Sequence, residues 1–204
     1  MNWEAFWDAK AQVGDKQAQV GRVGTGSQAG IEKRIAEHIA TRLDLQATDR
    51  LLDVCCGNGD LTALLAPRCA QTLGVDLSAQ LIDLAKTTHA AEGLHFVRAD
   101  ARQLSGLNGP FTKINLYFSF QYFEDYATGF RVLAEMESLL EPGGRMFIGD
   151  TPDARRWLTY YNQPIKWLRY LYQRWRGTEP MGKFWHPTSF IKMAQALDLQ
   201  VDIL

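Results

Sequence analysis

The sequence predicts an α/β fold with a doubly wound, mostly parallel sheet that has helices on both faces. Short apolar runs that suit buried strands alternate with segments whose apolar residues recur at helical spacing. These helical segments are long enough to cross over between parallel neighbours. A chain of 204 residues, 46% hydrophobic and 22% charged, suits a single domain over 1–204.

Charge and composition exclude several classes of function. The net charge is −1, which gives no general attraction to nucleic acid. The first residues are too polar for a signal peptide, and no apolar run reaches the length of a membrane span. Three cysteines, two of them adjacent, suit a reducing compartment. We therefore expect a cytoplasmic protein.

Local patterns predict the elements of the first half. Apolar residues recur every four positions from Ile31 to Leu43, which predicts a helix over 28–45. The run RLLDVCC predicts a buried strand that ends in a Gly-Asn-Gly turn. Asp60 then opens a helix, where a carboxylate favours the helix dipole.

The same alternation continues in the second half. A strand over 72–76 precedes a helix that Ser78 can cap. Pro142 and the two glycines after it stop a helix over 124–140. Further strands are predicted at 94–100, 111–120 and 145–150. The chain ends in the run LQVDIL, which supplies at most a sixth strand.

The fold class predicts where a ligand would bind. In doubly wound sheets, ligands lie outside the carboxyl ends of the strands, near the point where the strand order reverses. The residues just after each strand are therefore the candidates. They are the segments Cys55–Gly59, Asp76–Ser78, Asp100–Ala101, Phe118–Tyr122 and Asp150–Pro152.

The turn after the first strand has the properties of a nucleotide site. Gly57 and Gly59 allow positive φ and leave space for a ligand against the backbone. Neither the dinucleotide fingerprint nor the phosphate-binding P-loop is present. Asp76 lies about 20 residues further on, at a spacing where a carboxylate can accept hydrogen bonds from ribose hydroxyls. These features predict an adenosine-type cofactor without a pyrophosphate.

Four segments, in order, resemble the motifs of the class I S-adenosylmethionine-dependent methyltransferases. They are LLDVCCGNGDLT, GVDLSAQLIDLAK, FVRADARQL and LLEPGGRMFIGD, and the resemblance runs over about 30–151. It implies a Rossmann-like methyltransferase fold with S-adenosylmethionine as cofactor. In that family Asp76 would bind the ribose, and Asp100 with the Ala101 backbone would meet the adenine. The implied cofactor-binding residues are Asp53, Cys55, Gly57, Gly59, Asp76, Leu77, Asp100, Ala101 and Phe118.

The sequence departs from the family pattern at three places. Cys55 stands where relatives often have glycine, which predicts a backbone there that does not require positive φ. Thr112 stands where the family often has an aspartate, so no carboxylate contact is expected from it. The family sheet usually ends with an antiparallel sixth and seventh strand, and here the seventh is expected to be missing or replaced. An unpaired sheet edge could favour self-association into an oligomer.

Two segments outside the motifs are candidates for the acceptor side. Residues 1–29, with Trp3, Phe6 and Trp7, could form a flap over the cofactor, or a helix docked on the domain. Arg22 could then meet the methionine carboxylate. Residues 152–188 are basic and rich in aromatics. We expect a lid over the acceptor pocket there, with plain packing, lipid contact or nucleic-acid contact as the alternatives.

Large apolar and aromatic residues of 152–188 recur at helical spacing, which alone usually indicates a side that faces the core. They are Trp157, Tyr161, Ile165, Leu168, Tyr172 and Trp175. His186 is the titratable residue best placed to act as a base near neutral pH, although a structural role is slightly favoured for it. The predicted substrate-binding residues are Tyr122, Asp150, Tyr161, Trp185 and His186.

No catalytic residue is assigned, because methyl transfer from a sulfonium requires mainly that the acceptor be held in line. No metal is expected either, since Cys69 and the scattered histidines lack ligand spacing, and Cys55 and Cys56 are interpreted as small packing residues. The predicted activity is methyl transfer to a small, anionic or lipid-linked acceptor, at oxygen or nitrogen.

Two alternatives to this activity stay open. Methyltransferases of quinone biosynthesis carry a similar Asp-Val-Cys-Cys-Gly loop, which suggests carbon methylation of a quinone-type ring. The second alternative is a module that binds S-adenosylmethionine without turnover. The expected partner is a small-molecule substrate rather than nucleic acid, and membrane-surface contact through the basic segment 152–188 is an alternative.

Overall fold

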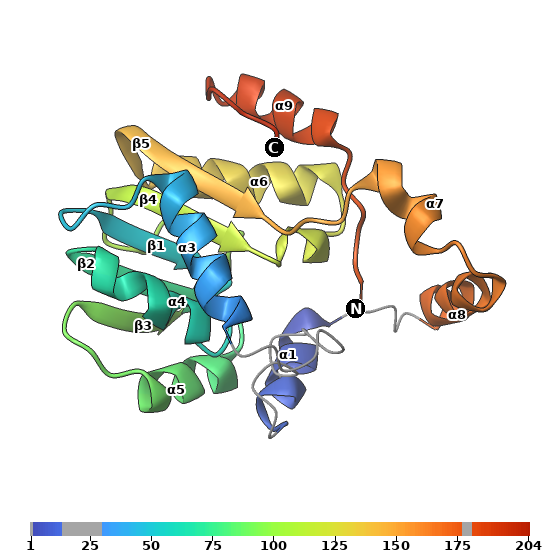
Figure 1. The fold of residues 1–204 in the computed structure, drawn as a ribbon, viewed down its shortest axis with the longest axis horizontal. Coiled ribbons are helices and arrows are strands. Elements are labelled where there is room, and N and C mark those ends of the chain that lie inside the picture. Colours follow the sequence, from blue (N-terminus) through green and yellow to red (C-terminus); the bar gives the residue numbers. More distant parts are fainter. Residues whose placement is uncertain (1, 14–29, 177–180) are drawn as a thin grey trace.

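The computed structural model describes residues 2–13, 30–176 and 181–204. At its centre is a five-stranded parallel sheet with the order β3-β2-β1-β4-β5 (Figure 1). The order reverses between β1 and β4, so the predicted doubly wound fold is confirmed. The strands are β1 (Arg50–Val54), β2 (Gln71–Asp76), β3 (Leu94–Arg98), β4 (Phe111–Tyr117) and β5 (Leu140–Gly149).

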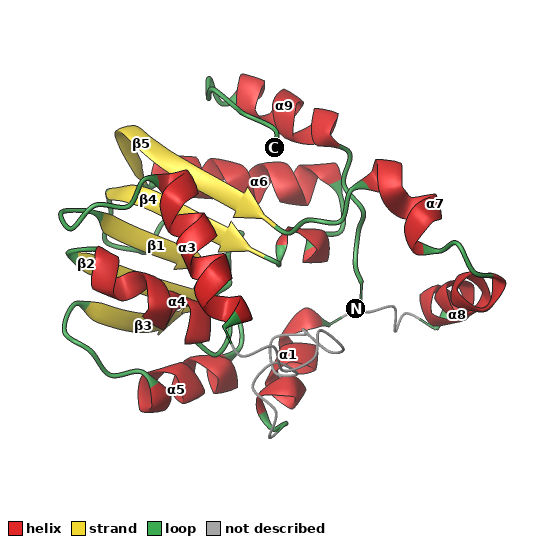
Figure 2. Ribbon diagram, viewed as in Figure 1, coloured by secondary structure: helices red, strands yellow, loops and turns green. Residues whose placement is uncertain are grey.

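Helices cover both faces of this sheet. Figure 2 shows α3 and α4 in front of it and α6 behind. The helices are α1 (Trp3–Ala11), α3 (Ile31–Leu43), α4 (Asp60–Leu65), α5 (Ala79–Thr88), α6 (Tyr126–Ser138), α7 (Trp157–Tyr160), α8 (Pro164–Trp175) and α9 (Pro187–Ala196). Short 3-10 turns lie at Ala66–Arg68, Phe120–Tyr122 and Ala154–Arg156.

Alternation along the strands divides the core between the two faces. Leu51 packs with α3 and α4, whereas its neighbour Leu52 packs on the opposite side with α6 and α9. A third cluster forms where α5 covers β2 and β3, around Ile82 and Phe96. The sheet is therefore covered on both faces.

Trp185 belongs to this core, although the sequence predicts it as a substrate-binding residue. Its side chain is 2% exposed and packs on the rings of Phe120 and Phe190. Its backbone N–H donates to the carbonyl of Pro152 at 2.8 Å, which holds the segment before α9 beside the chain that leaves β5. The sequence did not predict that Trp185 is buried.

The last strand begins earlier than predicted. Pro142, Gly143 and Gly144 lie inside β5 rather than before it, and α6 ends at Ser138. The pairing with β4 shifts register between Phe111 and Lys113, so these residues occupy a bulge. A proline is tolerated there because β5 is an edge strand, where a missing N–H leaves no partner unpaired.

The run LQVDIL, which the sequence allows as at most a sixth strand, forms no strand within the part of the chain that the structure describes. Leu199 and Val201 of this run are half-buried, whereas Ile203 and Leu204 are exposed. None of the helices among the described residues is long and apolar enough to cross a membrane.

The segment after β5 also differs from its prediction. The apolar and aromatic residues that were predicted to share one side of a helix are divided between α7 with the residue after it and α8. Those on α8 face solvent instead of the core. Ile165, Leu168, Tyr172 and Trp175 are all exposed. Helical spacing identifies which residues share a side of a helix, but it does not say whether that side is buried.

The packing of Trp185 can be tested at Gly129 of α6. A Cβ at Gly129 would lie 2.7 Å from the Trp185 ring and 3.2 Å from Phe120. We expect Gly129→Ala to lower the free energy of unfolding by about 1 kcal/mol, because overpacking of about 1–3 kcal/mol exceeds the helix-propensity gain of about 1 kcal/mol. Urea denaturation measures the difference.

Gly106→Ala is the matched control, since a Cβ there meets nothing within 4 Å. A Gly129→Ala protein as stable as the wild type would show that Trp185 is not rigidly packed.

Candidate functional site

A cavity of about 410 Å³ opens at the carboxyl ends of the strands, beside the switch point between β1 and β4. This volume lies within the ~300–1,000 Å³ range of small-molecule sites. Its lining includes eight predicted cofactor residues, namely Asp53, Cys55, Gly57, Asp76, Leu77, Asp100, Ala101 and Phe118. Tyr122, predicted for the substrate side, lines it as well.

Asp76 ends β2 and is almost fully buried. Its Oδ2 accepts a hydrogen bond from the Gly57 N–H at 2.9 Å, and its Oδ1 accepts one from the Ser78 N–H at 2.9 Å. Burial raises the pKa of Asp76, and these backbone N–H groups counteract part of the rise. Each carboxylate oxygen keeps acceptor capacity for a ligand in the cavity.

Asp53 is the centre of a second buried network. Its Oδ2 accepts a hydrogen bond from the Thr62 hydroxyl at 2.5 Å, and its Oδ1 accepts one from the Asn115 amide at 2.7 Å. The aspartate therefore joins β1 to α4 and to β4. Sequence reasoning missed both partners. A signal for Asn115 was available, because it is a polar residue in the middle of the apolar run FTKINLYF.

The turn after β1 adopts the left-handed conformation at every second residue. The φ angles are 60° at Cys55, 59° at Gly57 and 79° at Gly59. The prediction that Cys55 would not need positive φ is therefore wrong. The Cys56 N–H donates a hydrogen bond to the carbonyl of Val75 at 2.9 Å. The chain has to bend at Cys55, immediately after β1, to make this bond.

Gly59 has a different role from Gly57. It lies outside the residues that line the cavity, and a Cβ there would come within 2.8 Å of the Phe96 ring. The absence of a side chain at Gly59 thus serves the packing of α4 against β3. It also allows the positive φ with which α4 begins.

The adjacent cysteines are neutral thiols. Burial raises the pKa of Cys55 and of Cys56 well above the usual value, and the nearby Asp76 adds to the rise. Burial also raises the pKa of Cys69, to about 11. Within residues 2–13, 30–176 and 181–204, no group of His, Cys, Asp or Glu side chains is arranged to hold a metal ion.

Asp100 lies after β3 and is paired with Arg102. The guanidinium contacts both carboxylate oxygens, with Nη2 2.6 Å from Oδ2 and Nε 2.9 Å from Oδ1. Hydrogen bonding to Arg102 lowers the pKa of Asp100. Asp100 is thus ionised and oriented by its neighbour at the edge of the cavity.

Helix α1 lies against the cavity at Tyr122. The ring centroids of Trp3 and Trp7 are 4.6 Å and 5.2 Å from that of Tyr122, and both tryptophans line the cavity. Asp8 fixes the helix, because its Oδ1 accepts a hydrogen bond from the Ser78 hydroxyl at 2.5 Å. Ser78 is the predicted cap of α5, and its contact with α1 could not be foreseen.

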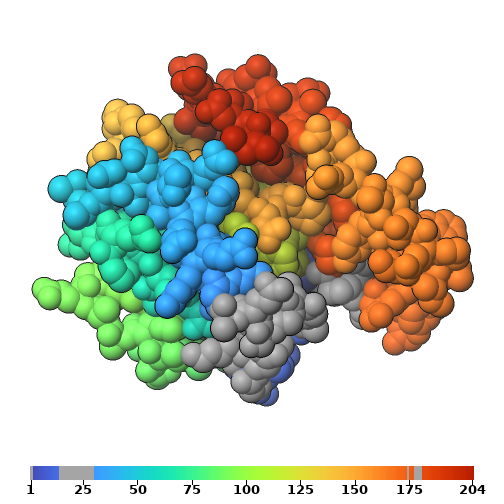
Figure 3. All heavy atoms as spheres, viewed as in Figure 1, coloured from blue at the N-terminus to red at the C-terminus, as the bar shows by residue number. Residues whose placement is uncertain are grey.

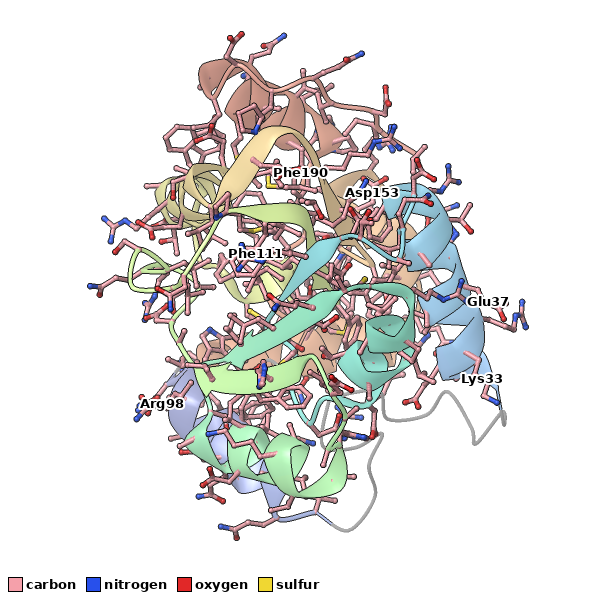
Figure 4. The ribbon with its side chains drawn as sticks, turned by 90° about the vertical axis from the view of Figure 1, so that its left-hand side faces the viewer. Lys33, Glu37, Arg98, Phe111, Asp153 and Phe190 are labelled. Atoms are coloured by element: carbon pink, nitrogen blue, oxygen red, sulfur yellow. The ribbon has the colours of Figure 1, made fainter. Side chains whose placement is uncertain are left out.

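Arg98, labelled in Figure 4, pairs with Glu4 and ties the end of β3 to α1. Arg22 lies outside the described residues, so its predicted contact with a methionine carboxylate stays a prediction.

Four predicted substrate residues are not among those that line the cavity. Asp150 follows β5 with a φ of 54°. Tyr161 packs against Tyr170, with ring centroids 4.6 Å apart. His186 caps α9, where its ring nitrogen accepts a hydrogen bond from the Thr188 N–H. Trp185 is in the core, as described above.

Thr112, which departs from the family pattern, has a structural role. Its hydroxyl donates to Asp49 at 2.7 Å and accepts a hydrogen bond from the Arg50 N–H at 3.0 Å. These bonds join the beginning of β4 to that of β1, far from the cavity. They explain why a threonine suits this position.

Comparison with known proteins agrees with this geometry. Residues 51–144 match a family model described as a methyltransferase domain. Demethylmenaquinone methyltransferase from Thermus thermophilus is 33% identical over 111 residues, which cover 52% of this chain and 49% of that protein. Methyltransferase GfsG from Streptomyces halstedii is 33% identical over 123 residues, 58% of this chain and 43% of that protein. The chain thus spans about half the length of these curated relatives.

Solved structures share the fold. N-methyltransferase NodS from Bradyrhizobium japonicum, in complex with S-adenosylhomocysteine, aligns with a TM-score of 0.64 at 22% identity, over 77% of this chain and 78% of that chain. An S-adenosylmethionine-dependent methyltransferase from Clostridium acetobutylicum aligns with a TM-score of 0.54 at 25% identity, over 63% and 52%. The sheet and the cavity define a Rossmann-like methyltransferase fold. Residues 51–144 are thus similar to a methyltransferase domain, and the fold is that of S-adenosylmethionine-dependent methyltransferases of known structure.

The left-handed backbone at Cys55 makes a testable prediction. Valine is close to cysteine in size but is branched at Cβ, and a branched residue is costly at positive φ. We expect Cys55→Val to lower the free energy of unfolding by about 1–2 kcal/mol relative to Cys55→Ala, in urea denaturation.

Cys69→Val is the matched control, because Cys69 has an extended backbone with φ −128°. If Cys55→Val and Cys55→Ala were equally stable, the turn would not hold Cys55 in the left-handed region.

Proposed function

We propose that this chain binds S-adenosylmethionine in the cavity and transfers its methyl group to a small acceptor. The observation that carries the proposal is the buried Asp76 carboxylate. It borders the cavity, is fixed by two backbone N–H groups, and keeps acceptor capacity for a pair of ribose hydroxyls. The loop of Asp100 and Ala101 would enclose the adenine, and the turn around Gly57 would approach the methionine part.

The charges of the described lining residues suit this cofactor. Arg102 is the single cationic side chain among them, and it is paired with Asp100. The acidic residues are Glu4, Glu32, Asp53, Asp60, Asp76, Asp100 and Glu124. Such a lining favours a ligand that carries a sulfonium and an ammonium group, and it disfavours an anionic acceptor.

When bound, S-adenosylmethionine supplies an electrophilic methyl group on its sulfonium. The chain then has to hold the acceptor in line with that methyl and exclude water. Trp3, Trp7 and Tyr122 form an aromatic wall that can do both. The Trp3 indole N–H is buried and has no hydrogen-bond partner among the described residues.

The acceptor that best fits this wall is a flat, largely apolar ring. The sequence alone predicts methylation at oxygen or nitrogen, with carbon methylation of a quinone-type ring as the alternative. The aromatic wall, the acidic lining and the relatives named demethylmenaquinone methyltransferase together support the quinone-type ring. An anionic acceptor has no unpaired cation among the described lining residues to bind it.

Cofactor binding can be tested by titration calorimetry with S-adenosylmethionine. We expect Asp76→Ala to weaken binding at least about 100-fold, because two charge-assisted hydrogen bonds of about 1.5–3 kcal/mol each are lost. Asp83→Ala is the matched control, since Asp83 is an exposed aspartate on α5 outside the cavity lining. Equal binding by wild type and Asp76→Ala would refute the site, provided that circular dichroism shows both to be folded.

Turnover can be tested by following S-adenosylhomocysteine release with a short-chain naphthoquinol, a phenol and an amine. We expect release with the quinol, and Tyr122→Ala to reduce it by about 10-fold or more through loss of acceptor positioning. Preference for the phenol or amine would restore oxygen or nitrogen methylation as the activity. Binding of S-adenosylmethionine without turnover of any acceptor would indicate a binding module.

A further inference from the structure

Helix α8 exposes an apolar surface that no other described residue of the protein covers. Six large side chains share this surface, and each is at least 41% exposed. They are Ile165, Trp167, Leu168, Leu171, Tyr172 and Trp175. Trp175, at 81%, is more exposed than any of the others. Leu158 of α7 is also exposed, at 76%.

The opposite side of α8 attaches it to the protein. Tyr170 packs against Tyr161 and Trp157, with ring centroids 4.6 Å and 5.6 Å apart. At about 100° per residue, the six exposed positions fall in one arc of the helix, away from Tyr170. These contacts lie on one side of α8, and the apolar arc faces away from them.

Cations flank this apolar arc. Lys166 and Arg169 lie within α8, and Arg176 follows it. The sequence from 164 to 176 contains no Asp or Glu, although the whole chain has a net charge of −1. Positive charge is thus concentrated beside the exposed tryptophans and leucines.

We propose that α8 docks in the interface of an anionic lipid bilayer, with its apolar arc among the acyl chains and its cations at the headgroups. A helix with Trp, Leu and Ile on one side and Lys and Arg on the other has the chemistry of interfacial membrane helices. Lys and Arg can bury their stems and keep their charges in the headgroup layer. Charge complementarity therefore selects anionic lipid as the occupant of this surface.

Charge and side-chain chemistry argue against two other occupants. A second copy paired through α8 would bring the same cations together without an acid on the helix to neutralise them. Single-stranded nucleic acid could stack on Trp167 and Trp175, but Ile165 and the leucines offer bases no planar partner.

The position of α8 connects this surface with the site. Figures 1 and 3 show α7 and α8 projecting beyond the carboxyl ends of the strands, the end at which the cavity opens. The chain that returns from α8 is tied to the cavity region, because the Lys183 N–H donates to the Gln121 carbonyl at 2.7 Å, next to Tyr122. Docking would bring a membrane-dissolved acceptor close to the cavity, and this consequence rests on the proposed function. The docking itself does not depend on that function.

The test is cosedimentation of the full chain with vesicles of phosphatidylcholine, alone or with a minority of phosphatidylglycerol. We expect at least tenfold stronger partitioning to the anionic vesicles at low salt, and loss of the difference at high salt. Leu168→Glu and Trp175→Glu should each weaken partitioning by about tenfold or more. Lys166→Gln and Arg169→Gln should each weaken it about fivefold, the effect of one cation near an anionic surface.

Ile203→Glu is the matched control, because Ile203 is an exposed apolar residue near the end of the chain. Its partitioning should equal that of the wild type. Absence of pelleting, or equal pelleting with and without phosphatidylglycerol, would overturn the proposal. A dimer in sedimentation velocity that Trp175→Glu dissociates, without vesicle binding, would assign the surface to a second copy.

Calorimetry with S-adenosylmethionine separates this proposal from the proposed function. Leu168→Glu and Trp175→Glu should bind the cofactor as the wild type does, since α8 contributes no residue to the cavity lining. If these variants lost both vesicle and cofactor binding, the effect would be a folding defect and the lipid-docking interpretation would fail.

Discussion

The Asp76 carboxylate accepts hydrogen bonds from two segments that are otherwise separate, the turn after β1 through Gly57 and the start of α5 through Ser78. A buried carboxylate needs such partners, and here they set the shape of the turn and the position of the helix at once. Ser78 also connects this region to α1, because its hydroxyl donates a hydrogen bond to Asp8 of that helix. The aromatic wall that α1 builds with Tyr122 thus depends, through two hydrogen bonds, on the same residue that borders the cavity.

Local chemistry explains which parts of this arrangement the sequence predicts. A strand, a glycine turn and an acidic residue at the end of the next strand each have a short-range pattern, so the position of Asp76 follows from the amino-acid sequence alone. Asn115 and Trp185 are different, because their roles depend on neighbours far along the chain. The conformation of Cys55 was predicted wrongly, since a family preference for glycine does not say what the backbone does when another residue replaces it.

The cavity and helix α8 differ in charge. Acidic side chains surround the cavity and suit a cationic cofactor, whereas α8 is purely basic between residues 164 and 176 and suits an anionic surface. A net charge of −1 conceals this separation. The helical pattern of the α8 stripe is equally compatible with a buried and an exposed side, and only the tertiary structure shows that Tyr170 faces the protein and Trp175 faces outward.

The proposed function requires that the cavity beside Asp76 hold the adenosine end of S-adenosylmethionine. A crystal structure of the chain with S-adenosylhomocysteine is the most direct test of this requirement. We expect both ribose hydroxyls on the Asp76 carboxylate, the adenine against Ala101, and the sulfur directed toward the wall of Trp3 and Tyr122. A ligand bound elsewhere, or one whose ribose is held by other residues while Asp76 keeps only its bonds to Gly57 and Ser78, would contradict the assignment.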